Sequence, residues 1–160
     1  MPRSRTLRLA ILSGGQTGVD RAALDVALDL GLPCGGWCPR GRRAEDGTLP
    51  PRYPLRETAS DEYAQRTEWN VRDADGTLIL AAGPLTGGTA YTAAVARKLG
   101  KSCLVVDLGA PQAEPVRRWL AEHRVHVLNV AGPRETTRPG IYARAAALLR
   151  EVLSDIGDRH

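Results

Sequence analysis

The sequence contains no phenylalanine, and tryptophan and tyrosine together make up only 4% of its 160 residues. Its net charge of +4 is spread along the chain, without the stripe of basic and aromatic residues that is typical of nucleic-acid-binding proteins. No apolar run approaches the roughly 20 residues of a membrane-spanning helix. The basic segment Met1–Thr6 precedes an apolar stretch that ends at Gly14 and is too brief for a secretory signal. We therefore expect a cytoplasmic protein that binds neither nucleic acid nor membrane.

Cysteine is also scarce, because the chain has only Cys34, Cys38 and Cys103. Such an odd, sparse set is typical of a reducing compartment rather than of a disulfide scaffold. No histidine or second cysteine pair completes a metal site with Cys34 and Cys38, so we interpret them as small buried apolar residues and expect no metal bound directly by side chains. The length and the 42% hydrophobic content predict one domain over residues 1–160.

The best-known phosphate-binding loops are missing as well. Gly18 is followed by Val19 and Asp20, where a Walker A loop needs lysine followed by serine or threonine. The glycines of this segment follow the order G-G-x-x-G, which differs from the dinucleotide fingerprint G-x-G-x-x-G. Neither an ATPase nor a standard nicotinamide-dependent enzyme follows from these residues.

What the chain does contain, at residues 9–25, is a short apolar run, a glycine-rich turn and a helical pattern. A strand followed by such a turn and a helix can bind an anion, because glycines allow close approach and the first helical N–H groups face the turn. A tight turn without a ligand is the alternative, but so many polar side chains at its mouth favour binding. The candidate binding residues here are Gly14, Gly15, Gln16, Thr17, Gly18, Asp20 and Arg21.

The rest of the chain alternates strands with helices. Strands are predicted near residues 35–38, 76–82, 102–107 and 125–130, and helices near 19–30, 60–72, 88–99, 112–123 and 139–156. An extended, proline-containing loop is predicted over residues 39–58. This order predicts an α/β fold, a Rossmann-like doubly wound parallel sheet of about five strands flanked by helices.

Two further glycine-containing turns, at residues 83–89 and 131–136, also follow predicted strands. Ligands of such folds bind at the carboxyl ends of the strands, so the three turns are expected around one crevice. Tyr63, Arg66 and Asn70 share one helical face and either lie at an edge or reach into that crevice. The further candidate binding residues are Arg40, in the long loop, with Arg66, Asn70, Gly87, Gly88, Thr89 and Arg134.

Six segments resemble the family called putative molybdenum carrier proteins, and the resemblance runs from about residue 9 to residue 153. They are Gly14-Gly-Gln-Thr-Gly-Val-Asp-Arg-Ala-Ala-Leu24, Gly36-Trp-Cys-Pro-Arg-Gly-Arg-Arg-Ala-Glu-Asp-Gly47, Tyr53-Pro-Leu-Arg-Glu-Thr58, Arg66-Thr-Glu-Trp-Asn-Val-Arg-Asp-Ala-Asp-Gly76, Gly87-Gly-Thr89 and Asn129-Val-Ala-Gly-Pro-Arg134. The resemblance implies a protein of the Rossmann-like SLOG superfamily, a cytoplasmic homo-oligomer (dimer or tetramer) that carries the molybdenum cofactor, molybdopterin. The metal would then be held by its pterin dithiolene, while the protein contacts phosphate and oxyanion groups.

The chain is also similar to the LONELY GUY phosphoribohydrolases, since Arg66 stands nine residues before Asp75 as in their helical motif. Their signature P-G-G-x-G-T-x-x-E is altered here, with Leu85 and Thr86 in place of two glycines and Thr92 in place of the glutamate. Threonine cannot supply the carboxylate of an N-glycosidic hydrolysis.

The sequence thus favours a carrier for a small phosphorylated ligand, a pterin or a nucleotide, with no catalytic residue assigned. The alternatives are a nucleotide-binding sensor and a nucleoside 5'-monophosphate phosphoribohydrolase. The hydrolase would take its carboxylate from Asp20, Glu45 or Glu68. A third possibility is an oligomeric interaction protein with a vestigial pocket.

Overall fold

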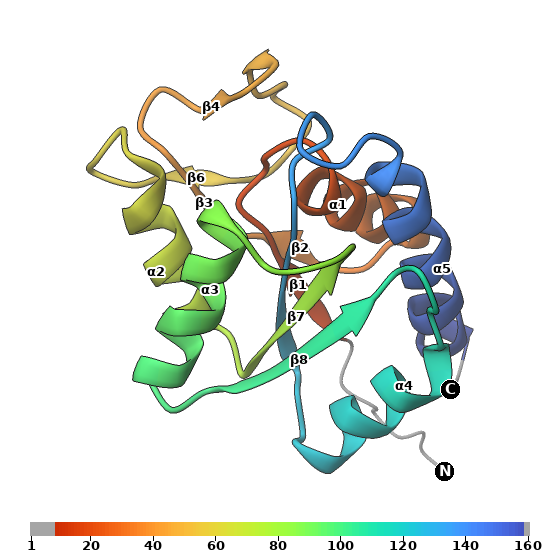
Figure 1. Ribbon diagram of the computed structural model, residues 1–160. Coiled ribbons are helices and arrows are strands. Elements are labelled where there is room, and N and C mark those ends of the chain that lie inside the picture. Colours follow the sequence, from red (N-terminus) through yellow and green to blue (C-terminus); the bar gives the residue numbers. More distant parts are fainter. Residues whose placement is uncertain (1–8, 159–160) are drawn as a thin grey trace, which may run out of the picture.

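A computed structural model describes residues 9–158 of the chain, with side chains described as far as residue 154 (Figure 1). The basic segment Met1–Thr6, for which no secretory role is expected, lies outside the described residues. Among the helices described, none combines the length and the apolar character that crossing a bilayer requires.

Five parallel strands form the central sheet in the order β2-β1-β9-β7-β8. These strands are β1 (Ala10–Leu12), β2 (Cys34–Gly35), β7 (Gly76–Ala81), β8 (Ser102–Asp107) and β9 (Val127–Ala131). The last strand of the chain is therefore the middle strand of the sheet, paired with β1 on one side and β7 on the other. The predicted α/β, Rossmann-like parallel sheet is confirmed.

Helices cover both faces of the sheet (Figure 1). On one face, α1 (Val19–Leu30) and α4 (Ala113–Glu122) pack against α5 (Ile141–Asp158). On the other face, α2 (Tyr63–Asp73) packs against α3 (Gly87–Lys98). Because α1 follows β1 and α3 follows β7 on opposite faces, the carboxyl ends of β1, β9 and β7 border a crevice between the two layers.

The main core lies between the sheet and the face of α1 and α5. Helix α1 buries apolar residues at helical spacing, from Val19 through Ala23 to Val26, and these meet the buried strand residues Leu78 and Leu80. Every residue of β7 is buried, as expected for an inner strand of a parallel sheet covered on both faces. A rigid core thus fixes the directions in which the three turns leave the sheet.

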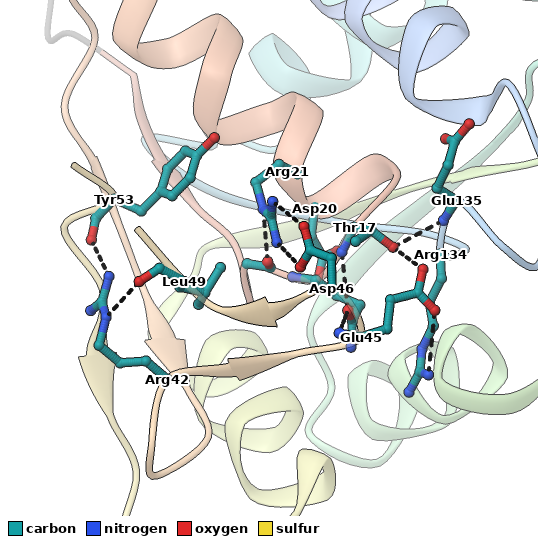
Figure 2. Close-up of polar contacts among 12 residues, drawn as sticks. Thr17, Asp20, Arg21, Arg42, Glu45, Asp46, Leu49, Tyr53, Arg134 and Glu135 are labelled. Atoms are coloured by element: carbon teal, nitrogen blue, oxygen red, sulfur yellow. Dashed lines mark hydrogen bonds and ion pairs between the residues drawn. The ribbon is translucent and has the colours of Figure 1, made fainter. Parts of the chain in front are cut away.

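The loop predicted over residues 39–58 contains three short strands, one of which pairs with a strand just before the loop. Strand β3 (Trp37–Cys38) pairs with β6 (Arg56–Glu57), and β4 (Arg43–Ala44) forms a hairpin with β5 (Gly47–Thr48). Arg42 holds this loop together, because its guanidinium donates hydrogen bonds to four backbone carbonyls, and Figure 2 shows those to Leu49 and Tyr53. The acceptors are Leu49, Pro50, Tyr53 and Leu55. The side chain of Arg42 therefore stabilises the conformation of the loop.

Candidate functional site

A pocket of about 480 Å³ lies in the crevice at the carboxyl ends of β1, β9 and β7. All three glycine-containing turns contribute to its wall. Gly14 and Gln16 come from the first turn, residues 86–89 from the second, and residues 132–134 from the third. Helix α2 closes the pocket with the face that carries Tyr63, Arg66 and Asn70. The turns therefore border one shared cavity rather than separate surfaces.

The first turn satisfies several of its own backbone amides. Gln16 N donates to Asp20 Oδ2 at 3.3 Å, Thr17 N donates to Gln16 Oε1 at 3.1 Å, and Gly15 N donates to Ser13 Oγ at 3.2 Å. These amides are thus already occupied inside the turn. This turn therefore presents side chains to a ligand, because these backbone amides already have acceptors.

Asp20 and Arg66 form a buried ion pair at the pocket wall. Arg66 Nη1 lies 3.8 Å from Asp20 Oδ2 and donates a hydrogen bond to the carbonyl of Gly14 at 2.9 Å. A side chain at position 14 would collide with this guanidinium, since a Cβ there would lie 2.4 Å from Arg66 Nη1. Glycine at position 14 therefore makes room for Arg66 to reach the pocket.

Burial shifts both ionisation equilibria. Desolvation raises the pKa of Asp20 to about 6, although Arg66, the amide of Gln16, Arg21 and Arg134 all act in the opposite direction. Desolvation likewise lowers the pKa of Arg66, against the stabilising charge of Asp20. A carboxyl that titrates near neutral pH thus lines the pocket.

We expect anion binding in this pocket to depend on the protonation of Asp20. The folded-state pKa is about 6, above the ordinary value of 3.8, so folding favours the protonated acid and Asp20 destabilises the fold as pH rises from about 4 to about 6. Over the upper part of that window the ionised carboxylate also repels a bound anion, so affinity for sulfate should fall between pH 5 and 7. Calorimetric titration measures this, and Asp20→Asn should flatten the profile; an unchanged slope in the variant would assign the effect elsewhere.

The second turn presents an open helix terminus. Gly87 and Gly88 begin α3, and within residues 9–158 no hydrogen-bond acceptor is found for their amides. A Cβ on either glycine would meet nothing within 4 Å. Free amides at a helix N-terminus favour a negatively charged group, because the helix dipole acts in the same direction.

The third turn is fixed to the first by two hydrogen bonds, one of them between backbone groups. Val19 N donates to the carbonyl of Pro133 at 3.3 Å, and Glu135 N donates to Thr17 Oγ1 at 3.1 Å. A Cβ at Gly18 would lie 2.3 Å from the carbonyl oxygen of Pro133. Glycine at position 18 therefore serves this close approach, which places Arg134 at the pocket.

Glu45 ties the hairpin of the long loop to both turns (Figure 2). Its carboxylate accepts hydrogen bonds from Thr17 Oγ1 and, at 2.7 Å, from Thr136 Oγ1, and lies 3.8 Å from Arg134 Nη1. Desolvation opposes ionisation, but these hydroxyls and Arg134 outweigh it and lower the pKa of Glu45. The ionised carboxylate of Glu45 thus links segments that are far apart in the chain.

One polar atom at the site has no partner. The Nε2 atom of Gln16 is fully buried and makes no hydrogen bond within the described part of the chain. Gln16 itself is 3% exposed and lines the pocket. A buried donor without an acceptor costs about 1–3 kcal/mol, so native proteins rarely leave one unless a ligand, ion or water completes it.

The predicted residues fall into two groups. Those that line the pocket are Gly14, Gln16, Asp20, Arg66, Asn70, Gly87, Gly88, Thr89 and Arg134. Those outside its lining are Gly15, Thr17, Gly18, Arg21 and Arg40.

The second group has other contacts, as far as the described residues show. Gly15 packs toward Leu49 and Leu55, with a φ of 81° that favours glycine. Arg21 forms a two-pronged ion pair with Asp46, as Figure 2 shows. Arg40 is exposed. Within the first group, Asn70 uses its amide to hold the backbone of Trp37.

Several lining residues were not predicted. Thr67 lies four residues after Tyr63, so the helical period that grouped Tyr63, Arg66 and Asn70 would have included it. Tyr91, Thr92, Asn129, Thr136 and Thr137 also line the pocket. No local pattern marks these residues, because the pocket only exists once β9, α2 and α3 are assembled.

The sheet and the position of the pocket define a Rossmann-like α/β protein with a ligand-sized cavity at its strand switch point. The chain belongs to the circularly permutated YpsA family of the SLOG group, whose model matches residues 11–153.

A solved structure is also similar to this chain. It is the crystal structure of a putative molybdenum carrier protein from Syntrophus aciditrophicus, which is 46% identical and superposes with a TM-score of 0.87. The similarity covers 92% of this chain and 95% of that one. The chain matches no curated protein.

Proposed function

We propose that this protein is a carrier that holds a phosphorylated, oxyanion-bearing ligand in the pocket, with the molybdenum cofactor as the favoured ligand. The observation that carries the proposal is the convergence of donors on one cavity. The free amides of Gly87 and Gly88, the unpartnered Nε2 of Gln16 and the cation of Arg66 belong to residues of the same 480 Å³ pocket. The name of the Syntrophus aciditrophicus protein supports molybdenum as part of the cargo.

The cargo's metal would reach the protein already coordinated. Within residues 9–158 no group of three or more His, Cys, Asp or Glu side chains is placed to bind a metal ion. A molybdenum centre would stay bound to the sulfur atoms of its pterin, since thiolate ligands suit such metals and the pocket offers none. The protein's own part is to bind phosphate and oxo groups with N–H and O–H donors.

Titration of the protein with molybdenum cofactor, molybdate and AMP tests the proposal. We expect at least one phosphorylated ligand to bind, and Gly88→Asp to weaken it at least tenfold, because a carboxylate then occupies the anion's place at the start of α3. Ala94→Asp is the matched control, since Ala94 is exposed on the same helix and lies outside the pocket lining. Failure of every phosphorylated ligand to bind, or equal affinity in Gly88→Asp, would contradict the proposal.

A second candidate function is supported by Asp20. A carboxyl with a pKa near 6 inside a nucleotide-sized pocket is suited to proton transfer, as a phosphoribohydrolase would need. The other two carboxylates fit that role less well. Glu45 holds the long loop against the turns, and Glu68, although it accepts a hydrogen bond from Tyr91, does not itself line the pocket. Thr92 stands where the LONELY GUY signature has its glutamate, and its hydroxyl donates a hydrogen bond to the carbonyl of Gly88.

Analysis of the AMP titrations for free adenine separates the two functions. Base release that disappears in Asp20→Asn, while AMP still binds, would establish the hydrolase. Binding without turnover supports the carrier. The nucleotide sensor, the oligomeric state and the cytoplasmic location stay predictions.

A further inference from the structure

The orientation of the Gln16 carboxamide is fixed by the backbone around it. Its Oε1 atom accepts hydrogen bonds from Thr17 N at 3.1 Å and from Glu45 N at 2.7 Å. Both partners are amide donors, so rotating the carboxamide by 180° would set its NH₂ group against two N–H groups. Nε2 therefore faces away from these amides, and it can only donate.

This fixed donor is held by two segments that are distant in the sequence. Thr17 belongs to the first turn, whereas Glu45 belongs to the hairpin of the long loop, whose position depends on the four carbonyl contacts of Arg42. Gln16 is 3% exposed, so water does not compete for its orientation. A buried donor without a partner calls for a ligand or a water molecule to complete it, and Gln16 belongs to the wall of the pocket that a ligand would enter.

We propose that Gln16 determines ligand specificity by requiring a hydrogen-bond acceptor on the ligand, a phosphate oxygen or a ring keto oxygen, next to its Nε2 atom. This inference rests on the proposed binding function of the pocket. An N–H group of the ligand at that position would meet a second N–H and be rejected, because two donors cannot pair. Gln16 is thus a selective element in a pocket whose cations attract any anion.

Gln16→Glu tests the proposal with almost no change of shape. One carboxylate oxygen still accepts from Thr17 N and Glu45 N, but the second oxygen now faces the ligand acceptor. Gln16→Met removes the donor without adding charge, but it also removes the acceptor of Thr17 N and Glu45 N, so circular dichroism and thermal unfolding check the fold of this variant. Both variants should lower affinity about tenfold or more, the effect of losing one hydrogen bond to an anionic or keto acceptor. Gln65→Glu is the matched control. The side chain of Gln65 also accepts a hydrogen bond from a backbone amide, that of Ser60, but it lies outside the pocket lining.

The probes are pyrophosphate, inosine monophosphate with its keto group, and AMP with an amino group at the same ring position. A loss for pyrophosphate in both variants identifies phosphate as the partner. A loss for inosine monophosphate alone, with wild-type preference over AMP, identifies the ring oxygen. Unchanged affinity in both variants, or a loss in Gln16→Glu only, would overturn the role of Gln16 as a donor. If the wild-type protein binds none of the three probes while circular dichroism shows it folded, the proposed function fails instead.

Discussion

Replacing Arg66 with methionine is expected to lower ligand affinity by about a hundredfold and to destabilise the protein by about 3 kcal/mol. The substitution removes the cation of the pocket wall and leaves the carboxylate of Asp20 buried without its ion-pair partner. It also leaves the carbonyl of Gly14 without its hydrogen bond from Nη1. For a domain of this length, such a loss lowers the melting temperature by roughly 6–12 °C. Calorimetric titration and thermal unfolding measure the two effects.

Two comparison variants make this prediction specific. Arg72→Met lies on the same helix, but Arg72 is half exposed and pairs with Asp73 away from the pocket, so affinity should be unchanged and stability nearly so. The double variant Asp20→Asn with Arg66→Met should unfold at a higher temperature than Arg66→Met alone, because it removes the buried unpaired charge. The single variant Asp20→Asn completes the double-mutant cycle, and a coupling free energy near zero would mean that the ion pair does not couple the two residues.

Gly18→Ala is expected to destabilise the protein by about 3 kcal/mol or more. Gly18 has a φ of 79°, which side-chain-bearing residues rarely adopt, and its added Cβ would lie 2.3 Å from the carbonyl oxygen of Pro133. Relief requires the third turn to move away from the first, which also displaces Arg134 from the pocket. Chemical denaturation should therefore show lower stability, and titration should show weaker binding, in the same variant.

Gly88→Ala is the stability control for this prediction. A Cβ at position 88 meets nothing within 4 Å, and alanine favours helix over glycine by up to about 1 kcal/mol. Its unfolding free energy should equal or exceed that of the wild type. A Gly18→Ala protein as stable as the wild type would show that the first and third turns are not held in the contact described.

The helices and the strands of the main sheet were predictable because each depends on neighbours in the sequence. The apolar run of residues 76–81 between glycine and a second turn marks a buried strand, and the helical spacing of Tyr63, Arg66 and Asn70 brings all three to the pocket. Parallel strands with right-handed crossovers place their carboxyl ends on one edge, so the convergence of the three turns also followed from the order of elements.

The roles of individual side chains were less predictable. Arg42 and Arg40 look alike in a basic loop, yet one is bonded to four carbonyls and the other is exposed. Glu45 reaches Thr136 across 91 positions of the chain, and no local pattern records such a contact. The amides of the first turn were expected to hold an anion, but Asp20 and Gln16 already accept two of them.

By itself, the sequence determined the α/β class, the three turns and the polar residues at their mouths, because local hydrophobic period and glycine placement decide such features. Only the tertiary structure decided that the last strand occupies the middle of the sheet, that Asp20 and Arg66 pair in a buried wall, and that the Nε2 atom of Gln16 is buried without a partner among the described residues. These depend on which distant segments share a hydrogen bond or exclude water, and that is settled by the packing of the whole chain.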